Sequence, residues 1–156
     1  MWHILLFYAL LLGGGAYALG WGGAPERLFA LMCLAGFAAS LVMESPFPNR
    51  FRHVELGLLL VDVAMFCGLY LLSVFSTRFW PIWMTAMQGL VVLAHVMPLT
   101  PQPSAFGYQA LEEFWSFPQL GLLAVATYRH RKRLARLGAD PAWTLSFTRA
   151  ESPRSH

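Results

Sequence analysis

Five apolar stretches fill almost all of this chain, and its ionisable residues lie mainly between these stretches or at their ends. The stretches cover residues 2–20, 28–43, 56–76, 79–97 and 114–128. A transmembrane helix needs about 20 apolar residues to cross the hydrocarbon core. Soluble domains carry about 25% charged residues, whereas this chain has 12% charged and 57% hydrophobic residues. The sequence therefore predicts an all-α bundle of five transmembrane helices.

The first stretch allows two interpretations. Ala16-Tyr17-Ala18 is similar to the small-residue cleavage site of a secretory signal peptide. A signal peptide also needs a positively charged start, and no Lys or Arg precedes Ile4. We therefore expect a retained first helix, in which Gly13-Gly14-Gly15 permits close approach of a neighbouring backbone.

The fifth stretch is the shortest, because its apolar part covers only residues 114–128. It reaches a spanning length if residues 109–113 also enter the headgroup region. Pro118 is expected to kink this helix, since proline lacks the backbone N–H of a regular turn. A re-entrant segment is the alternative interpretation.

The positions of Lys and Arg predict the orientation, because cytoplasmic loops of membrane proteins are enriched in both residues. With five spans, nine of the eleven Lys and Arg residues fall on one side and only Arg50 and Arg52 on the other. We therefore predict an N-terminus outside and a C-terminus in the cytoplasm. Residues 1–136 form the predicted bundle, and residues 137–156 form a predicted cytoplasmic C-terminal tail.

A basic run follows the fifth stretch. Its members are Arg129, Arg131, Lys132 and Arg133. The run is a topology signal, and it also attracts anionic lipids by about 1 kcal/mol per basic residue. Docking of a cytoplasmic partner is a further interpretation of the same run. Nucleic acid is excluded as a partner, because recognition needs a basic face on a folded soluble domain.

Asp62 lies among apolar residues in the third stretch, roughly 9 Å from its start at 1.5 Å per residue. An ionised carboxylate at the centre of a membrane helix costs about 2.5 to 3.5 kcal/mol on insertion scales. Asp62 must therefore be protonated, face the bundle interior or find a partner. It is either a proton or cation site or a structural hydrogen bond between helices.

Other polar residues extend this candidate site. Gln88 and His95 follow helical spacing on the fourth stretch, and His95 lies at a depth comparable to that of Asp62. On the fifth stretch, Glu112 and Glu113 belong to a polar stripe that continues to Gln119. Adjacent residues on a helix point about 100° apart, so at most one of the two glutamates joins a given site. The predicted intramembrane polar site comprises Asp62, Gln88, His95, Glu112 and Glu113, and solvated interfacial acids are the alternative for the glutamates.

Metal and haem binding are two further possibilities for these residues. Asp62, His95 and Glu112 are ligand types acceptable to zinc or iron, but no H-E-x-x-H or E-x-x-H spacing supports them. Axial haem ligation would need His95 with His3 or His53. We predict neither a metal nor a cofactor. Cys33 and Cys67 form no C-x-x-C pair, and no nucleophile elbow, phosphate loop or dinucleotide fingerprint is present.

The stretch Ser76-Thr77-Arg78-Phe79-Trp80-Pro81-Ile82-Trp83, followed by Gln88 and His95, resembles a pattern in uncharacterised small bacterial inner-membrane proteins. Trp115 and the arginine-rich exit at residues 128–131 are similar as well. The resemblance covers residues 56–136 and implies a multi-pass protein of the bacterial inner membrane. It implies no activity.

The leading functional interpretation is an accessory or assembly subunit that packs through its transmembrane helices. Small size, small-residue helix faces and the absence of a catalytic motif favour this interpretation over an enzyme. Its partners would be membrane lipids and either a larger membrane complex or further copies of the chain. The alternative is a small proton- or ion-coupled channel or carrier in which Asp62 titrates. A membrane enzyme that uses Asp62, His95 and Glu112 as acid and base on a lipid or quinone is a third possibility.

Overall fold

A computed structural model describes residues 2–43, 56–95 and 105–143, with side chains for all of these except residue 3 and residues 105–113. These parts of the chain form five α-helices and no sheet. The helices are α1 (Trp2–Trp21), α2 (Ala24–Met43), α3 (Leu56–Phe75), α4 (Trp80–Ala94) and α5 (Ala105–Leu137). The predicted all-α fold is therefore confirmed.

Three of the described helices, α1, α2 and α3, are long and apolar enough to cross a membrane. This finding suggests a multi-pass membrane protein. The fourth helix is apolar but has only 15 residues in its described part. It begins with Pro81 in its first turn, where the missing N–H of proline costs nothing.

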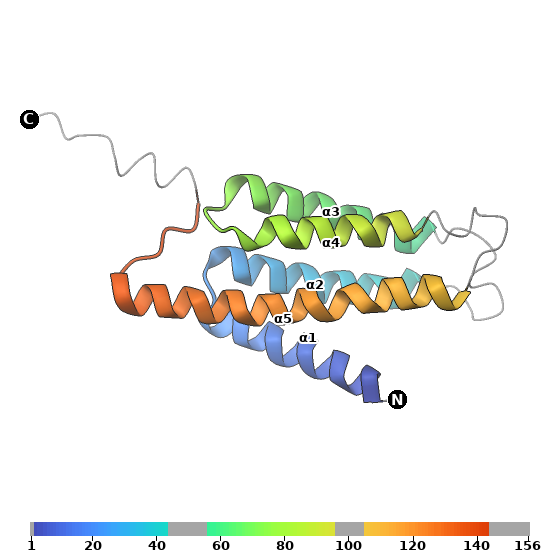
Figure 1. The fold of residues 1–156 in the computed structure, drawn as a ribbon, viewed down its shortest axis with the longest axis horizontal. Helices are drawn as coiled ribbons and strands as arrows, with labels where there is room; N and C mark the ends of the chain where they lie inside the picture. The colour runs from blue at the N-terminus through green and yellow to red at the C-terminus, as the bar shows by residue number, and fades with distance from the viewer. Residues whose placement is uncertain (1, 44–55, 96–104, 144–156) are drawn as a thin grey trace, which may run out of the picture.

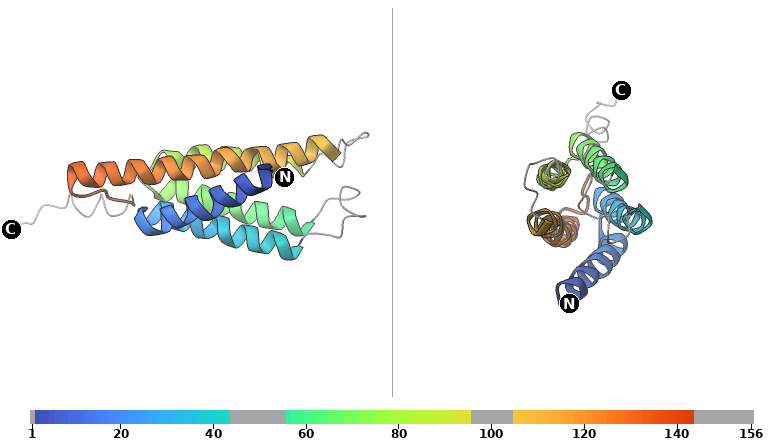
Figure 2. Two further views of the ribbon diagram at one scale, coloured as in Figure 1. Left: turned by 90° about the horizontal axis from the view of Figure 1, so that it is seen from below. Right: turned by 90° about the vertical axis from the view of Figure 1, so that its right-hand side faces the viewer.

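The helices form two layers that run roughly parallel to one another. Figure 2 shows α1, α2 and α3 side by side in one layer, with α4 and α5 covering it. Neighbouring helices in this order are in contact, and α5 also touches α1 and α2. Because α1 begins at one end of the bundle and α5 finishes at the other, the chain enters and leaves the bundle at opposite ends (Figure 1).

The fifth helix is continuous from Ala105 to Leu137, although Pro118 lies inside it. Its last turns extend beyond the ends of the other helices (Figure 1). Gly138 then adopts a positive φ of 71°, a conformation typical of the residue that follows a helix. The chain reverses there, and we call residues 138–143 the return segment.

The return segment contacts the short loop between α3 and α4. Ser76 and Trp143 form an isolated antiparallel bridge. Thr77 donates its hydroxyl to the carbonyl of Pro141 over 2.6 Å, and its backbone N–H donates to the carbonyl of Ala142 over 3.1 Å. This part of the predicted tail is therefore ordered against the chain's own helices.

Apolar side chains fill the middle of the bundle. Phe29, Leu69, Met84 and Leu123, from four different helices, are fully buried, and we call them the apolar layer. Many large apolar residues on the outside are instead exposed, for example Leu12, Leu60 and Leu93. Exposed leucines around a helical bundle are what a lipid environment requires.

Candidate functional site

Four polar side chains meet inside the bundle on one side of the apolar layer. Asp62 comes from α3, Gln88 and His95 come from α4, and Gln119 comes from α5. We call them the Asp62 cluster. Gln88, His95 and Gln119 are buried, and the side chain of Asp62 is 20% exposed.

The helices place these residues by simple periodicity. Gln88 and His95 are seven residues apart on α4, which is close to two full turns, so both lie on the face towards α3. His95 is the residue that ends α4. Asp62 lies six residues after the start of α3, and Gln119 follows Pro118 on α5. Three helices therefore contribute to one site near the end where α1 begins.

Both oxygens of the Asp62 carboxyl group are engaged. Gln88 donates its amide N–H to Oδ1 over 2.9 Å, while Nε2 of His95 lies 2.8 Å from Oδ2. Gln119 donates to the amide oxygen of Gln88 over 3.2 Å. The amide of Gln88 thus accepts on one side and donates on the other, which fixes its orientation.

The contact between Asp62 and His95 holds a proton. A hydrogen bond at 2.8 Å needs one hydrogen between Oδ2 and Nε2. That hydrogen belongs to the imidazole when Asp62 is ionised, and to the carboxyl group when the imidazole nitrogen accepts. The same heavy-atom geometry therefore accommodates either donor.

The structure brings together three of the five residues predicted for this site, namely Asp62, Gln88 and His95. It adds Gln119, which the sequence had placed on the same polar stripe as the glutamates. The backbones of Glu112 and Glu113 belong to α5, but their side chains lie outside the described part of the chain. Their role stays a prediction.

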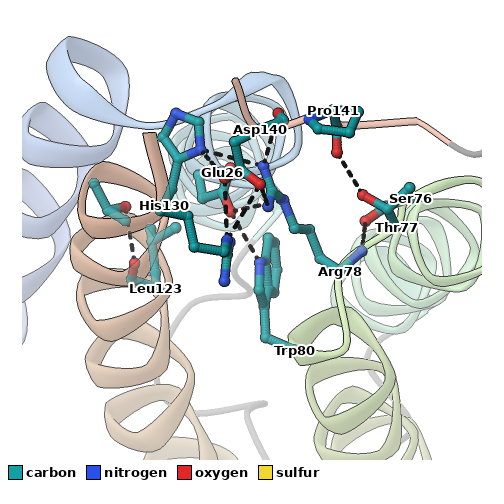
Figure 3. Close-up of polar contacts among 11 residues, drawn as sticks. Glu26, Ser76, Thr77, Arg78, Trp80, Leu123, His130, Asp140 and Pro141 are labelled. Carbon is teal, nitrogen blue, oxygen red and sulfur yellow. Dashed lines mark hydrogen bonds and ion pairs between the residues drawn. The ribbon is translucent and has the colours of Figure 1, made fainter. Parts of the chain in front are cut away.

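A second polar cluster lies on the opposite side of the apolar layer, at the end where α5 finishes. It comprises Glu26 of α2, Arg78 of the α3–α4 loop, His130 and Arg133 of α5, and Asp140 of the return segment (Figure 3). We call it the Arg78 cluster. It joins three segments of the bundle to the return segment.

Asp140 is the centre of this cluster. Arg78 donates from Nη1 to Oδ1 over 2.5 Å, and Arg133 donates from Nε to both carboxylate oxygens at 3.1 and 3.2 Å. His130 lies with Nδ1 only 2.7 Å from Oδ2, so we assign the proton of this nitrogen to the bond with Asp140. Burial raises the pKa of Asp140, but the hydrogen bonds from Arg78, His130 and Arg133 outweigh this effect and lower it to about 2.

Glu26 is fully buried beneath Arg78. Its Oε1 accepts the indole N–H of Trp80 over 3.1 Å and lies 3.7 Å from Nε of Arg78. Its Oε2 has no hydrogen-bond partner among the residues that the structure describes. Gly23 provides the room for this arrangement, because a Cβ there would lie 2.8 Å from Oε2.

Sequence reasoning missed this cluster. Glu26, Arg78 and His130 share no motif or helical spacing in the sequence that would link them. One signal was present, because Gly138 followed by Pro141 is a pattern that ends a helix and turns the chain. That pattern predicts a reversal, which would carry Asp140 back towards the bundle.

The predicted docking residues divide into two groups. Arg129, Arg131 and Lys132 are exposed on the last turns of α5, and the guanidinium of Arg131 lies 5.8 Å from the centre of the Trp21 ring. Arg133 is half-buried and binds Asp140 instead. Three of the four side chains are therefore accessible to lipid headgroups or a partner.

Neither cluster offers a metal site, because the described residues contain no group of three His, Cys, Asp or Glu side chains that could hold an ion. Comparison with other proteins adds no family, since no protein-family model, curated protein or solved structure matches this chain.

Proposed function

We propose that this chain is a five-span membrane protein that takes up and passes protons at Asp62 and His95, as a small proton-coupled channel or carrier. The observation that carries this proposal is the 2.8 Å contact between Nε2 of His95 and Oδ2 of Asp62 inside the bundle. Ionisable residues within membrane helices pair with one another in the proton relays of pumps and transporters.

A purely structural role for Asp62, as a hydrogen bond between two helices, explains only one of the two contacts of its carboxyl group. One hydrogen bond from Gln88 to Asp62 already links α3 to α4. The second oxygen, Oδ2, contacts His95. Histidine is the amino acid whose side chain ordinarily changes charge closest to neutral pH. One fifth of the Asp62 side chain is exposed at the surface of the bundle.

The distribution of Lys and Arg supports an orientation for this carrier. Nine such residues against two favour a cytoplasmic C-terminus and an external N-terminus in a bacterial inner membrane. Asp62 lies six residues after the start of α3, and α3 starts at the end of the bundle where α1 begins (Figure 1). In this orientation the Asp62 cluster exchanges protons with the external side.

Proton flux tests the proposal. The purified full-length protein is reconstituted into liposomes of phosphatidylethanolamine and phosphatidylglycerol, with a pH-sensitive dye inside and a potassium diffusion potential as the driving force. We expect proton entry with the wild type and with Arg129→Gln, which alters an exposed charge outside the site. Asp62→Asn should reduce entry to the rate of protein-free liposomes. Equal flux in Asp62→Asn and wild type would refute the proposal.

A second candidate function is an accessory subunit of a larger membrane complex. The observation that favours it is the end of α5, which extends beyond the other helices and exposes Arg129, Arg131 and Lys132 (Figure 1). The native mass in a mild detergent, with mass spectrometry of co-purifying chains, tests this function. Stoichiometric larger proteins would support a subunit, and a lone monomer or symmetric oligomer would count against it.

A further inference from the structure

We infer that Glu26 is a second proton-binding site, which lies across the apolar layer from Asp62. The inference deepens the proposed function and rests on it, because a second carboxyl group at the other end of the bundle would give a proton that binds at Asp62 a further place to bind. Glu26 belongs to α2, whereas the Asp62 cluster is built from α3, α4 and α5. The two sites therefore share no residue.

The first support is the unequal environment of the two carboxyl oxygens. Oε1 of Glu26 accepts a hydrogen bond from Trp80, while Oε2 is buried with no hydrogen-bond partner among the described residues. A buried ion that lacks hydrogen bonds is much costlier than the corresponding neutral acid. Oε2 is thus the position at which an added proton relieves the cost of burial.

The second support is the way in which nearby charge is distributed. Arg78, His130 and Asp140 are the titratable and charged groups that face Glu26 from the loop, from α5 and from the return segment. Arg78 directs Nη1 at Asp140 and leaves its own Nε, 3.7 Å from Glu26, without a hydrogen bond to any described residue. Arg78 thus gives Glu26 an ion pair but no hydrogen bond, while its Nη1 donates to Asp140.

The third support is the separation of the two sites. Trp80, which binds Glu26, and Gln88, which binds Asp62, are eight residues apart on α4, or about 12 Å at 1.5 Å per residue. Met84 lies halfway between them and Leu123 lies on the facing helix, and both are fully buried. These apolar side chains offer no hydrogen bond that could link the two sites.

The proposed step involves a single proton. A proton from solvent at the return-segment end adds to Oε2 of Glu26, which becomes the hydroxyl of a neutral carboxyl group. Oε1 remains the carbonyl oxygen and keeps the hydrogen bond from Trp80. Release is the reverse of this step, and no other covalent bond changes.

Infrared difference spectroscopy tests the inference on the full-length protein in lipid membranes. Spectra recorded between two pH values should contain the carbonyl band of a protonated carboxyl group that disappears in Glu26→Gln. Glutamine keeps the shape of the side chain and the acceptor for Trp80. In Trp80→Phe the same band should move to higher frequency, because the carbonyl loses its hydrogen-bond donor. The band should persist in Asp62→Asn.

The test remains informative if Glu26→Gln does not fold, since Trp80→Phe changes the hydrogen bonding of Glu26 and leaves the Glu26 side chain itself in place. A difference spectrum that is identical in wild type, Glu26→Gln and Trp80→Phe would overturn the inference. This result differs from failure of the proposed function, which is seen as unchanged proton flux in Asp62→Asn. A Glu26 band together with normal flux in Asp62→Asn would leave Glu26 as a proton site but remove the carrier to which we assign it.

Discussion

Arg78 donates a hydrogen bond to Asp140 over 2.5 Å, although the two residues are 62 positions apart in the chain. Both side chains are buried, and the bond joins the α3–α4 loop to the return segment (Figure 3). Hydrogen bonds between charged groups are shorter and stronger than those between neutral groups. This pair is therefore one of the contacts that hold the chain after α5 against the bundle.

Asp140→Ala should release the return segment and lower the free energy of unfolding. Loss of a hydrogen bond to a charged group costs about 1.5 to 3 kcal/mol, and Arg78, His130 and Arg133 all lose a partner. Thermal unfolding in detergent measures the loss, and chymotrypsin cleavage at Trp143 measures the release. Arg129→Gln, with an exposed side chain, is the control. Equal stability and equal cleavage in Asp140→Ala and wild type would contradict this role.

Acid should weaken the same contact over a defined range of pH. The pKa of Asp140 is lowered from 3.8 to about 2 in the folded protein, so its stabilising effect is complete above pH 4 and is lost as the pH falls through about 2. The shift corresponds to about 2 kcal/mol. The difference in melting temperature between wild type and Asp140→Asn should therefore shrink as the pH is lowered from 5 to 2. A difference that stays constant over this range would assign the stabilisation to another group.

The helices could be predicted because each is a continuous apolar run. The predicted third stretch, residues 56–76, differs from α3 by a single residue at its end. The second helix begins at Ala24, four residues before its apolar run, because Pro25 and Glu26 suit a first turn. The fifth helix is much longer than its apolar part, since charged residues continue it to Leu137. Hydropathy detects the lipid-facing portion of a helix and not its polar ends.

The Asp62 cluster could be predicted in part, and the Arg78 cluster could not. Gln88 and His95 lie on one face of the predicted fourth helix, and His95 lies at about the same depth in the predicted membrane as Asp62. In contrast, Glu26, Arg78 and Asp140 lie in three segments that approach each other only after the chain reverses at Gly138. The spacing of residues within one helix does not predict a contact of this kind, because the contact depends on how the ends of different helices pack.

Gln88→Leu should destabilise the bundle by leaving two polar groups without partners. Asp62 would lose the donor to Oδ1, and Gln119 would lose its acceptor. Each buried polar group left without a hydrogen bond costs about 1 to 3 kcal/mol. Thr85→Val is the matched control on α4, because within the described part of the chain the hydroxyl of Thr85 bonds to the carbonyl of Pro81 in its own helix. A melting temperature for Gln88→Leu that equals that of Thr85→Val would show that Gln88 does not link the three helices.

Gly23→Ala should disturb the environment of Glu26 without changing any charge. A Cβ at this position would lie 2.8 Å from Oε2 of Glu26 and 3.0 Å from Cε1 of His130. Neither neighbour can move aside freely, because Glu26 is bonded to Trp80 and His130 is bonded to Asp140. Overpacking of this kind costs about 1 to 3 kcal/mol, and we expect a lower melting temperature together with a shifted Glu26 carboxyl band.

Gly20→Ala is the matched control for Gly23→Ala, since a Cβ at Gly20 would meet nothing within 4 Å. Alanine is the better helix former by about 1 kcal/mol, so Gly20→Ala in the last turn of α1 should leave the melting temperature unchanged or raise it. If the two alanine variants behave alike, close packing at Gly23 does not determine the stability of the protein. If only Gly23→Ala alters the Glu26 band, close packing of the backbone at Gly23 determines how the buried carboxyl group holds its proton.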